Sequence, residues 1–210
     1  LWKLDSKIGW KSPWGVGFPG WHIECSVMSR KYLGQPFDIH TGGIDLIPVH
    51  HNNEIAQSES AYNEPLAHYW MHGAFVTVND AKMAKSVGGS ITLKTLEDET
   101  ISAIAYRYWL LTAHYRSPIN FSLEAVRGAQ NALIRLMVTV SSLPTDGKVI
   151  LAYKDRFMAY INDDLDTPKA IALIWDILKD NNQSDADRRA TIIDFDKVFG
   201  LKLDTIKKSE

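Results

Sequence analysis

The sequence predicts an α/β fold followed by an all-α helical bundle, and two observations support this prediction. Residues 1–93 contain 10 of the 13 glycines and 6 of the 7 histidines. In this part, short apolar runs alternate with loops and helical segments, a pattern typical of α/β proteins. After residue 94, apolar residues recur every three or four positions over long segments, as they do in amphipathic helices.

Glycines and polar runs set the bounds of the elements expected in the first part. Gly34 follows a helical segment, and glycine is the favoured residue just after a helix. The expected elements are, in chain order, a helix over 20–33, a strand over 37–40, a helix over 50–61, two short strands around Gly73 within 69–78, and a mobile polar loop over 79–93.

Helical spacing and capping residues set the elements expected in the second part. Ser122 is expected as the N-cap of a helix, and Pro168 fits the first turn of another. The expected helices cover 99–113 (with Ile101, Ile104, Ala105, Tyr108, Leu111 and Thr112 on one face), 122–143 (with Val126, Ala129, Leu133, Leu136, Met137 and Val140), 151–163, 168–180 and 185–199.

Composition excludes several classes of protein. The chain has 23 basic and 25 acidic residues, so a nucleic acid could be bound only through a local patch. A single cysteine, Cys25, excludes an internal disulfide and favours a reducing compartment. Neither a signal peptide nor an apolar run of membrane-spanning length is found, so we expect a cytoplasmic protein with no membrane partner. The chain begins at Leu1 without a methionine, which suggests a fragment.

Cys25, His50 and Glu54 are candidate metal ligands. His50 and Glu54 are four positions apart, so on a helix both side chains lie on the same face, one turn apart. Imidazole, carboxylate and thiolate groups are all zinc ligands. The ordinary alternatives are a surface His–Glu pair and a cysteine that is only a small core residue.

Lys82 and Lys85 are candidate phosphate ligands. They stand three residues apart in the polar loop, before Ser86 and two glycines. Two lysines in a closing loop could neutralise a triphosphate, although exposed lysine-rich loops are usually only solvated.

Five ordered blocks of sequence resemble the cysteinyl-tRNA synthetase family. The resemblance covers essentially the whole chain, and flanking pieces at 12–15 and 166–168 match as well. The blocks are Gly-Trp-His-Ile-Glu-Cys-Ser (20–26), His-Thr-Gly-Gly-Ile-Asp-Leu (40–46), His-His-Asn-Asn-Glu-Ile-Ala-Gln-Ser-Glu (50–59), Tyr-Trp-Met-His (69–72) and Lys-Met-Ala-Lys-Ser (82–86).

The resemblance implies a zinc site and a truncated catalytic domain. Family members are class I enzymes that bind one zinc ion through two cysteines, a histidine and a glutamate. Cys25, His50 and Glu54 match three of these ligands. The remaining cysteine and the HIGH signature are absent here, so we expect both upstream of Leu1. The isolated fragment is therefore expected to be inactive.

The resemblance also implies roles for other residues. Trp21, His22, Asp45 and His51 would bind the cysteine substrate, with Asp45 pairing with its ammonium group. ATP, with Mg²⁺, would contact Gly42, Gly43, His40 and Lys85. Lys82 and Lys85 match the two lysines of the KMSKS signature and would act in catalysis by holding the phosphates.

Three domains are implied: residues 1–78 as the C-terminal half of a Rossmann-like nucleotide-binding domain, 79–120 as the KMSKS-type loop and stem-contact region, and 121–210 as a helical bundle contacting tRNA. The implied function is a cysteine–tRNA ligase, which forms cysteinyl-adenylate from L-cysteine and ATP and transfers cysteine to tRNA(Cys). Zinc would select the substrate thiol.

Several residues depart from the family pattern, and two other functions compete with the ligase. The departures, which remove neither a zinc ligand nor a phosphate lysine, are Phe18, Thr41, Pro48, Val49, Asn52 and Ala84. One competing function is the related ligase that joins cysteine to an amino sugar in mycothiol synthesis. The other is a non-catalytic paralogue that binds zinc or RNA.

Overall fold

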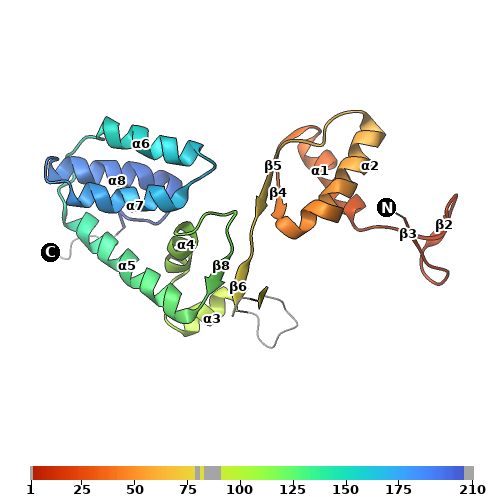
Figure 1. Ribbon diagram of the computed structural model, residues 1–210, viewed down its shortest axis with the longest axis horizontal. Helices are drawn as coiled ribbons and strands as arrows, with labels where there is room; N and C mark the ends of the chain where they lie inside the picture. Colours follow the sequence, from red (N-terminus) through yellow and green to blue (C-terminus); the bar gives the residue numbers. More distant parts are fainter. Residues whose placement is uncertain (1, 79–80, 83–90, 206–210) are drawn as a thin grey trace. The chain divides into compact units, whose positions relative to one another are not determined.

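The computed structural model describes residues 2–78, 81–82 and 91–205, apart from the side chains of Ala81 and Lys82. The chain divides into two compact units, Leu1–Ala74 and Phe75–Glu210, which we call the first and the second unit (Figure 1). An α/β part followed by a helical part is confirmed. None of the described helices is long and apolar enough to cross a membrane.

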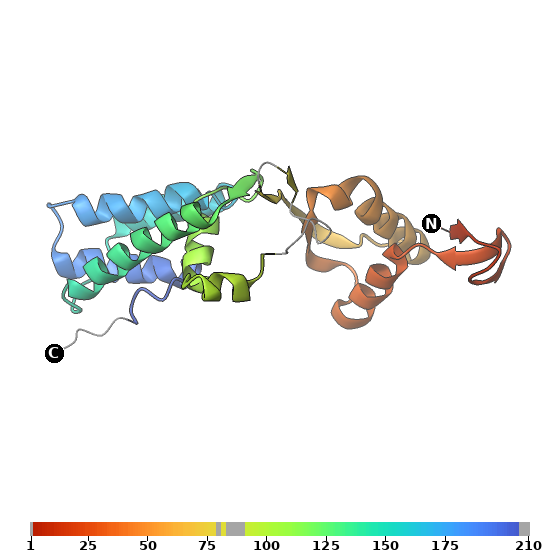
Figure 2. The same ribbon diagram turned by 90° about the horizontal axis from the view of Figure 1, so that it is seen from below.

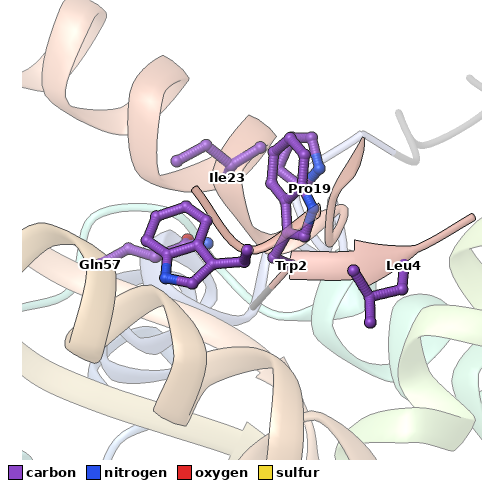
Figure 3. A pocket seen from close by; sticks show the side chains of 6 residues that line it. Trp2, Leu4, Pro19, Ile23 and Gln57 are labelled. Atoms are coloured by element: carbon purple, nitrogen blue, oxygen red, sulfur yellow. The ribbon is translucent and has the colours of Figure 1, made fainter. Parts of the chain in front are cut away.

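The first unit begins with a small antiparallel sheet that the sequence analysis did not predict. Its strands are β1 (Trp2–Leu4), β2 (Trp10–Ser12) and β3 (Gly15–Pro19), in the order β1-β3-β2. Gly17 is required because a Cβ there would lie 2.0 Å from the carbonyl oxygen of Lys3. A pocket of about 670 Å³ adjoins this sheet and is lined by Trp2, Leu4, Trp14, Pro19, Ile23 and Gln57 (Figure 3). None of these six is a predicted site residue.

The rest of the first unit is a βαβ unit with a preceding helix. Its elements are α1 (His22–Leu33), β4 (Phe37–Gly43), a 3₁₀ turn (Ile44–Leu46), a π-helical turn (Ile47–His51), α2 (Asn52–Tyr62) and β5 (Ala67–Gly73). β4 and β5 pair in parallel, as the crossover through α2 requires. Gly34 follows α1 with a φ of 86°, as predicted.

Two details of the first unit differ from the sequence expectations. β4 continues to Gly43, past the expected end at residue 40, because Gly42 pairs with His72 and Gly43 with Gly73 in β5. The second helix was expected from residue 50, but the structure has the π-helical turn up to His51 and the α-helix only from Asn52.

The interior of the first unit is small and largely polar. Its buried apolar cluster consists of Phe37, Leu66 and Ala67, with Trp70 packed against it. By contrast, six buried residues from α1, the π-helical turn and α2 can hydrogen-bond or ionise: His22, Ser26, His50, His51, Glu54 and Ser58. Buried polar groups are costly unless they are paired or bind a ligand. This polar interior is therefore where a functional site is expected.

The second unit is an apolar helical assembly beside a small sheet. β6 (Val76–Val78) lies between β7 (Ala81–Lys82) and β8 (Ile119–Phe121). The helices are α3 (Leu93–Asp98), α4 (Ala103–Leu111), α5 (Leu123–Ser142), α6 (Leu151–Asn162), α7 (Thr167–Lys179) and α8 (Asp185–Phe199). Contacts join α6, α7 and α8 to one another, and these helices lie side by side in Figures 1 and 2.

Most helices of the second unit begin and end close to the predicted residues. Ser122 caps α5 by accepting a hydrogen bond from the backbone of Ala125, as predicted. The helix expected over 99–113 is shorter, because Thr100 has a φ of 58° and the helix begins only after the cap at Ser102. Ile101, expected on that helix, is still buried in the core at 1% exposure.

Candidate functional site

Cys25, His50 and Glu54 come together inside the first unit. Cys25 lies on α1, His50 lies in the π-helical turn that leads into α2, and Glu54 lies in the first turn of α2. One ligand atom from each residue lies within 4.8 Å of the other two. Glu54 has no exposed surface and His50 is 4% exposed. The structure brings these three predicted ligands together, while their role in binding zinc stays a prediction, and we call them the ligand trio.

Glu54 and His50 approach each other closely without forming a hydrogen bond. His50 Nε2 lies 2.8 Å from Glu54 Oε1, yet Oε1 is buried and has no hydrogen-bond partner. A buried polar atom without a partner needs an explanation, and one explanation is that this oxygen binds a cation. Nitrogen, sulfur and carboxylate oxygen together form a donor set typical of zinc. The trio therefore fits the zinc ion that the family resemblance implies.

The surroundings of Cys25 favour the protonated form of its thiol when no cation is bound. Burial raises the pKa of this thiol, and the negative charges of Glu54 and Glu24 raise it further. A bound metal ion reverses this effect, because it stabilises the thiolate directly. Metal binding at the trio should therefore release a proton.

Trp21 and His22 surround the imidazole of His50. The Trp21 ring stacks on the His50 ring with centroids 3.6 Å apart, and Trp21 is 51% exposed. His22 Nδ1 lies 3.1 Å from His50 Nδ1. Burial lowers the pKa of His22, and the neighbouring His50 lowers it further, so the ring is neutral at pH 7. Asn53 Nδ2 lies 3.1 Å from His22 Nε2, so His22 links Asn53 to the candidate metal ligand His50.

Further histidines surround Glu54. His40 Nε2 donates to Glu54 Oε2 over 2.7 Å, and His51 Nδ1 lies 2.8 Å from His72 Nε2. Burial lowers the pKa of His51 to about 4, and the charges of His40, His72 and His50 act in the same direction. His51 is therefore neutral at pH 7. His72 was not among the predicted site residues, although it lies in the block at 69–72 that the family resemblance rests on.

Asp45, Gly42 and Gly43 lie at the carboxyl end of β4. Asp45 is exposed in the 3₁₀ turn that directly follows this strand. Ligands of parallel α/β sheets bind outside this end of the strands. Gly42 also has a packing role, because a Cβ there would lie 2.6 Å from Cε1 of His51. The contacts of these residues with cysteine or ATP stay predictions.

The two predicted phosphate lysines belong to the second unit. Lys82 is the last residue of β7, paired with Thr77 of β6. Lys85 lies outside the described residues. Their roles stay predictions.

Comparison with known proteins identifies the family. Residues 1–131 match the family model described as the tRNA synthetases class I (C) catalytic domain. The chain belongs to this family. The resemblance inferred from the sequence blocks is therefore confirmed.

Curated relatives of this chain are more than twice as long as the part that it matches. It is 48% identical over 209 residues to cysteine–tRNA ligase 1 of Burkholderia lata, covering 97% of this chain and 44% of that protein. It is 44% identical over 202 residues to the cysteine–tRNA ligase of Geobacter metallireducens, covering 87% of this chain and 41% of that protein. The chain thus spans less than half the length of these relatives.

Solved class I synthetase structures share the fold of the chain. One is the ternary LeuRS–tRNA–LeuAMS complex from Agrobacterium radiobacter, with a TM-score of 0.66 and 15% identity over 91% of this chain and 32% of that chain. Another is methionyl-tRNA synthetase of Mycobacterium tuberculosis bound by methionyl-adenylate, with a TM-score of 0.58 and 18% identity over 96% of this chain and 50% of that chain.

Proposed function

We propose that the protein carrying this chain is a cytoplasmic cysteine–tRNA ligase that activates L-cysteine with ATP and transfers it to tRNA(Cys). The observation that carries this proposal is the ligand trio, which brings together a thiol, an imidazole and a carboxylate, and one oxygen of this carboxylate is buried without a hydrogen-bond partner. The names of the relatives support the same activity.

Selection of cysteine over serine is the physical problem that the trio would address. A thiol and a hydroxyl are nearly the same shape, so a shaped pocket alone discriminates weakly between them. Zinc held by Cys25, His50 and Glu54 would bind the substrate sulfur as a thiolate, which a hydroxyl matches poorly. The half-exposed Trp21 stacks on His50, so its indole would form a wall of the amino-acid pocket beside this ligand.

The remaining site residues would hold the substrate for the transfer. Asp45, at the end of β4, would pair with the substrate ammonium. The cysteine carboxylate would then attack the α-phosphorus of ATP, forming a carboxyl–phosphate bond as pyrophosphate leaves. Lys82 and Lys85, with Mg²⁺, would balance the charge on the β- and γ-phosphates during this step. A terminal hydroxyl of tRNA would finally take the cysteinyl group and release AMP.

Cysteine-dependent exchange of pyrophosphate into ATP by the intact protein tests this function, with serine as the control substrate. We expect exchange with cysteine and none with serine. We also expect exchange to fall about 100- to 1,000-fold in Lys85→Ala, the cost of losing one donor that stabilises a transition state. The absence of exchange in zinc-replete protein would refute the proposal and favour a non-catalytic paralogue.

The acceptor is tested separately with labelled cysteine. Transfer of label to tRNA(Cys) is expected. Transfer to an amino sugar instead would identify the mycothiol-type ligase and contradict the choice of acceptor, while leaving the activation step intact.

A further inference from the structure

The two oxygens of the Glu54 carboxylate have different surroundings. Oε2 accepts a hydrogen bond from His40 Nε2 over 2.7 Å, whereas Oε1, close to His50, has no hydrogen-bond partner. We propose that His40 is a positioning residue of the metal site, which holds Oε2 and so presents Oε1 alone to the cation. This inference rests on the proposed zinc function and concerns the same site.

The direction of the His40–Glu54 hydrogen bond follows from chemistry. An ionised carboxylate only accepts hydrogen bonds, so the ring nitrogen of His40 must carry the proton. The ring also packs against two neighbouring rings, because its centroid lies 4.6 Å from that of Trp70 and 4.5 Å from that of His51, with a tilt of about 30° to each. Neighbouring side chains thus hold the donor in place before any metal binds.

The consequence of this hydrogen bond is a carboxylate that binds through one oxygen. Without the donor, the buried carboxylate of Glu54 could turn about its last bond and bind a cation through both oxygens. A second oxygen would occupy the coordination position that the substrate thiolate needs. His40 would therefore keep that coordination position open for the substrate. Its role would be to set the number of ligands on the cation as well as to strengthen metal binding.

The same residues could also be interpreted as a second cation site, because His40, His51 and Glu54 bring ligand atoms within 4.8 Å of one another. Two of these groups are already occupied. His40 Nε2 is hydrogen-bonded to Glu54, and His51 Nδ1 is hydrogen-bonded to His72. The unpartnered Oε1 belongs to the ligand trio, so the geometry points to one cation. His40 would not bind this cation but would be hydrogen-bonded to the other oxygen of its carboxylate ligand.

Zinc affinity of the intact protein, measured by competition with a chelator, tests the role of His40 without relying on activity. We expect His40→Leu to weaken zinc binding about 10- to 100-fold, the usual effect of losing a hydrogen bond to a ligand. His40→Gln should recover most of the affinity, because its amide nitrogen can reach the position of Nε2. His40→Asn should not, since its amide is too short. His68→Leu, at an exposed position of β5, is the matched control and should bind zinc as the wild type does.

Cobalt substitution supplies a second readout that a purely structural role would not change. The visible absorption of bound Co²⁺ reports its coordination number, so we expect His40→Leu to alter the spectrum and His68→Leu to leave it unchanged. Wild-type affinity together with a wild-type cobalt spectrum in His40→Leu would overturn the positioning role alone. A wild-type protein that binds no zinc would instead overturn the zinc function and this inference with it. If His40→Leu fails to fold, equal zinc affinity in the Gln and Asn variants would refute the proposal.

Discussion

Replacement of Cys25 by serine is the most direct test of the ligand trio. Sγ is one of three donor atoms that lie within 4.8 Å of one another. Burial and the nearby carboxylates already raise the pKa of this thiol, so a strong cation is needed to form the thiolate. A serine hydroxyl is a far weaker acid, and it would offer the cation a neutral oxygen in place of a thiolate.

Loss of a metal ligand should weaken zinc binding more than loss of a hydrogen bond to a ligand, which lowers metal affinity about 10- to 100-fold. We therefore expect Cys25→Ser to weaken zinc binding by at least about 100-fold, or about 2.8 kcal/mol at about 1.4 kcal/mol per tenfold change. At a free zinc concentration that just saturates the wild type, the variant should retain almost no metal.

The assay compares zinc content and chelator competition in the intact wild-type protein, Cys25→Ser and Ser29→Ala. Ser29 lies one turn further along α1, and its hydroxyl donates to the backbone carbonyl of Ser26, so its replacement controls for damage to the helix. About one zinc ion per chain is expected in the wild type and the control. Wild-type zinc content and affinity in Cys25→Ser would show that Cys25 is not a ligand.

Two further predictions concern packing and pH. Gly42→Ala should lower the free energy of unfolding by about 1–3 kcal/mol, because the added Cβ would overlap the buried ring of His51; an unchanged urea midpoint would contradict the close approach. In the second unit, hydrogen bonds from Arg116, then from Tyr115, lower the pKa of Asp164 from 3.8 to about 2. The charged carboxylate therefore stabilises the fold fully above pH 3.8, and this stabilisation is lost as the pH falls towards 2. The urea midpoint of the wild type should exceed that of Asp164→Asn at pH 6, and the gap should close between pH 4 and pH 2. A gap independent of pH would rule out the ion pair as its cause.

The sequence predicted the helices of the second unit well because their apolar residues follow the helical period. In α5, Val126, Leu133, Leu136 and Val140 are all buried, as the spacing required. The N-terminal sheet was missed because its outer strands are only three residues long, too short for an alternating pattern to emerge. The late start of α4, which was expected from residue 99, depends on the backbone of Thr100, where a positive φ is rare for a threonine.

The candidate site was predictable in its ligands but not in its surroundings. The spacing of His50 and Glu54 placed them one helical turn apart, and the structure brings them together. Their contact with Cys25 depends on how α1 packs beside α2, which no local pattern encodes. The pairing of His40 with Glu54 likewise joins β4 to α2 across 14 residues and could not be inferred from spacing.

The two-stranded parallel sheet of the first unit affects how the protein should be handled. Within the described residues, β4 and β5 pair only with each other, so each also presents a row of backbone groups that no neighbouring strand covers. Ile39 and Tyr69, which face each other in this sheet, are 52% and 69% exposed. Unpaired strand edges with exposed apolar side chains favour edge-to-edge association between molecules. The 210-residue chain produced by itself is therefore expected to aggregate through β4 or β5, and the intact protein is the better material for metal and exchange measurements.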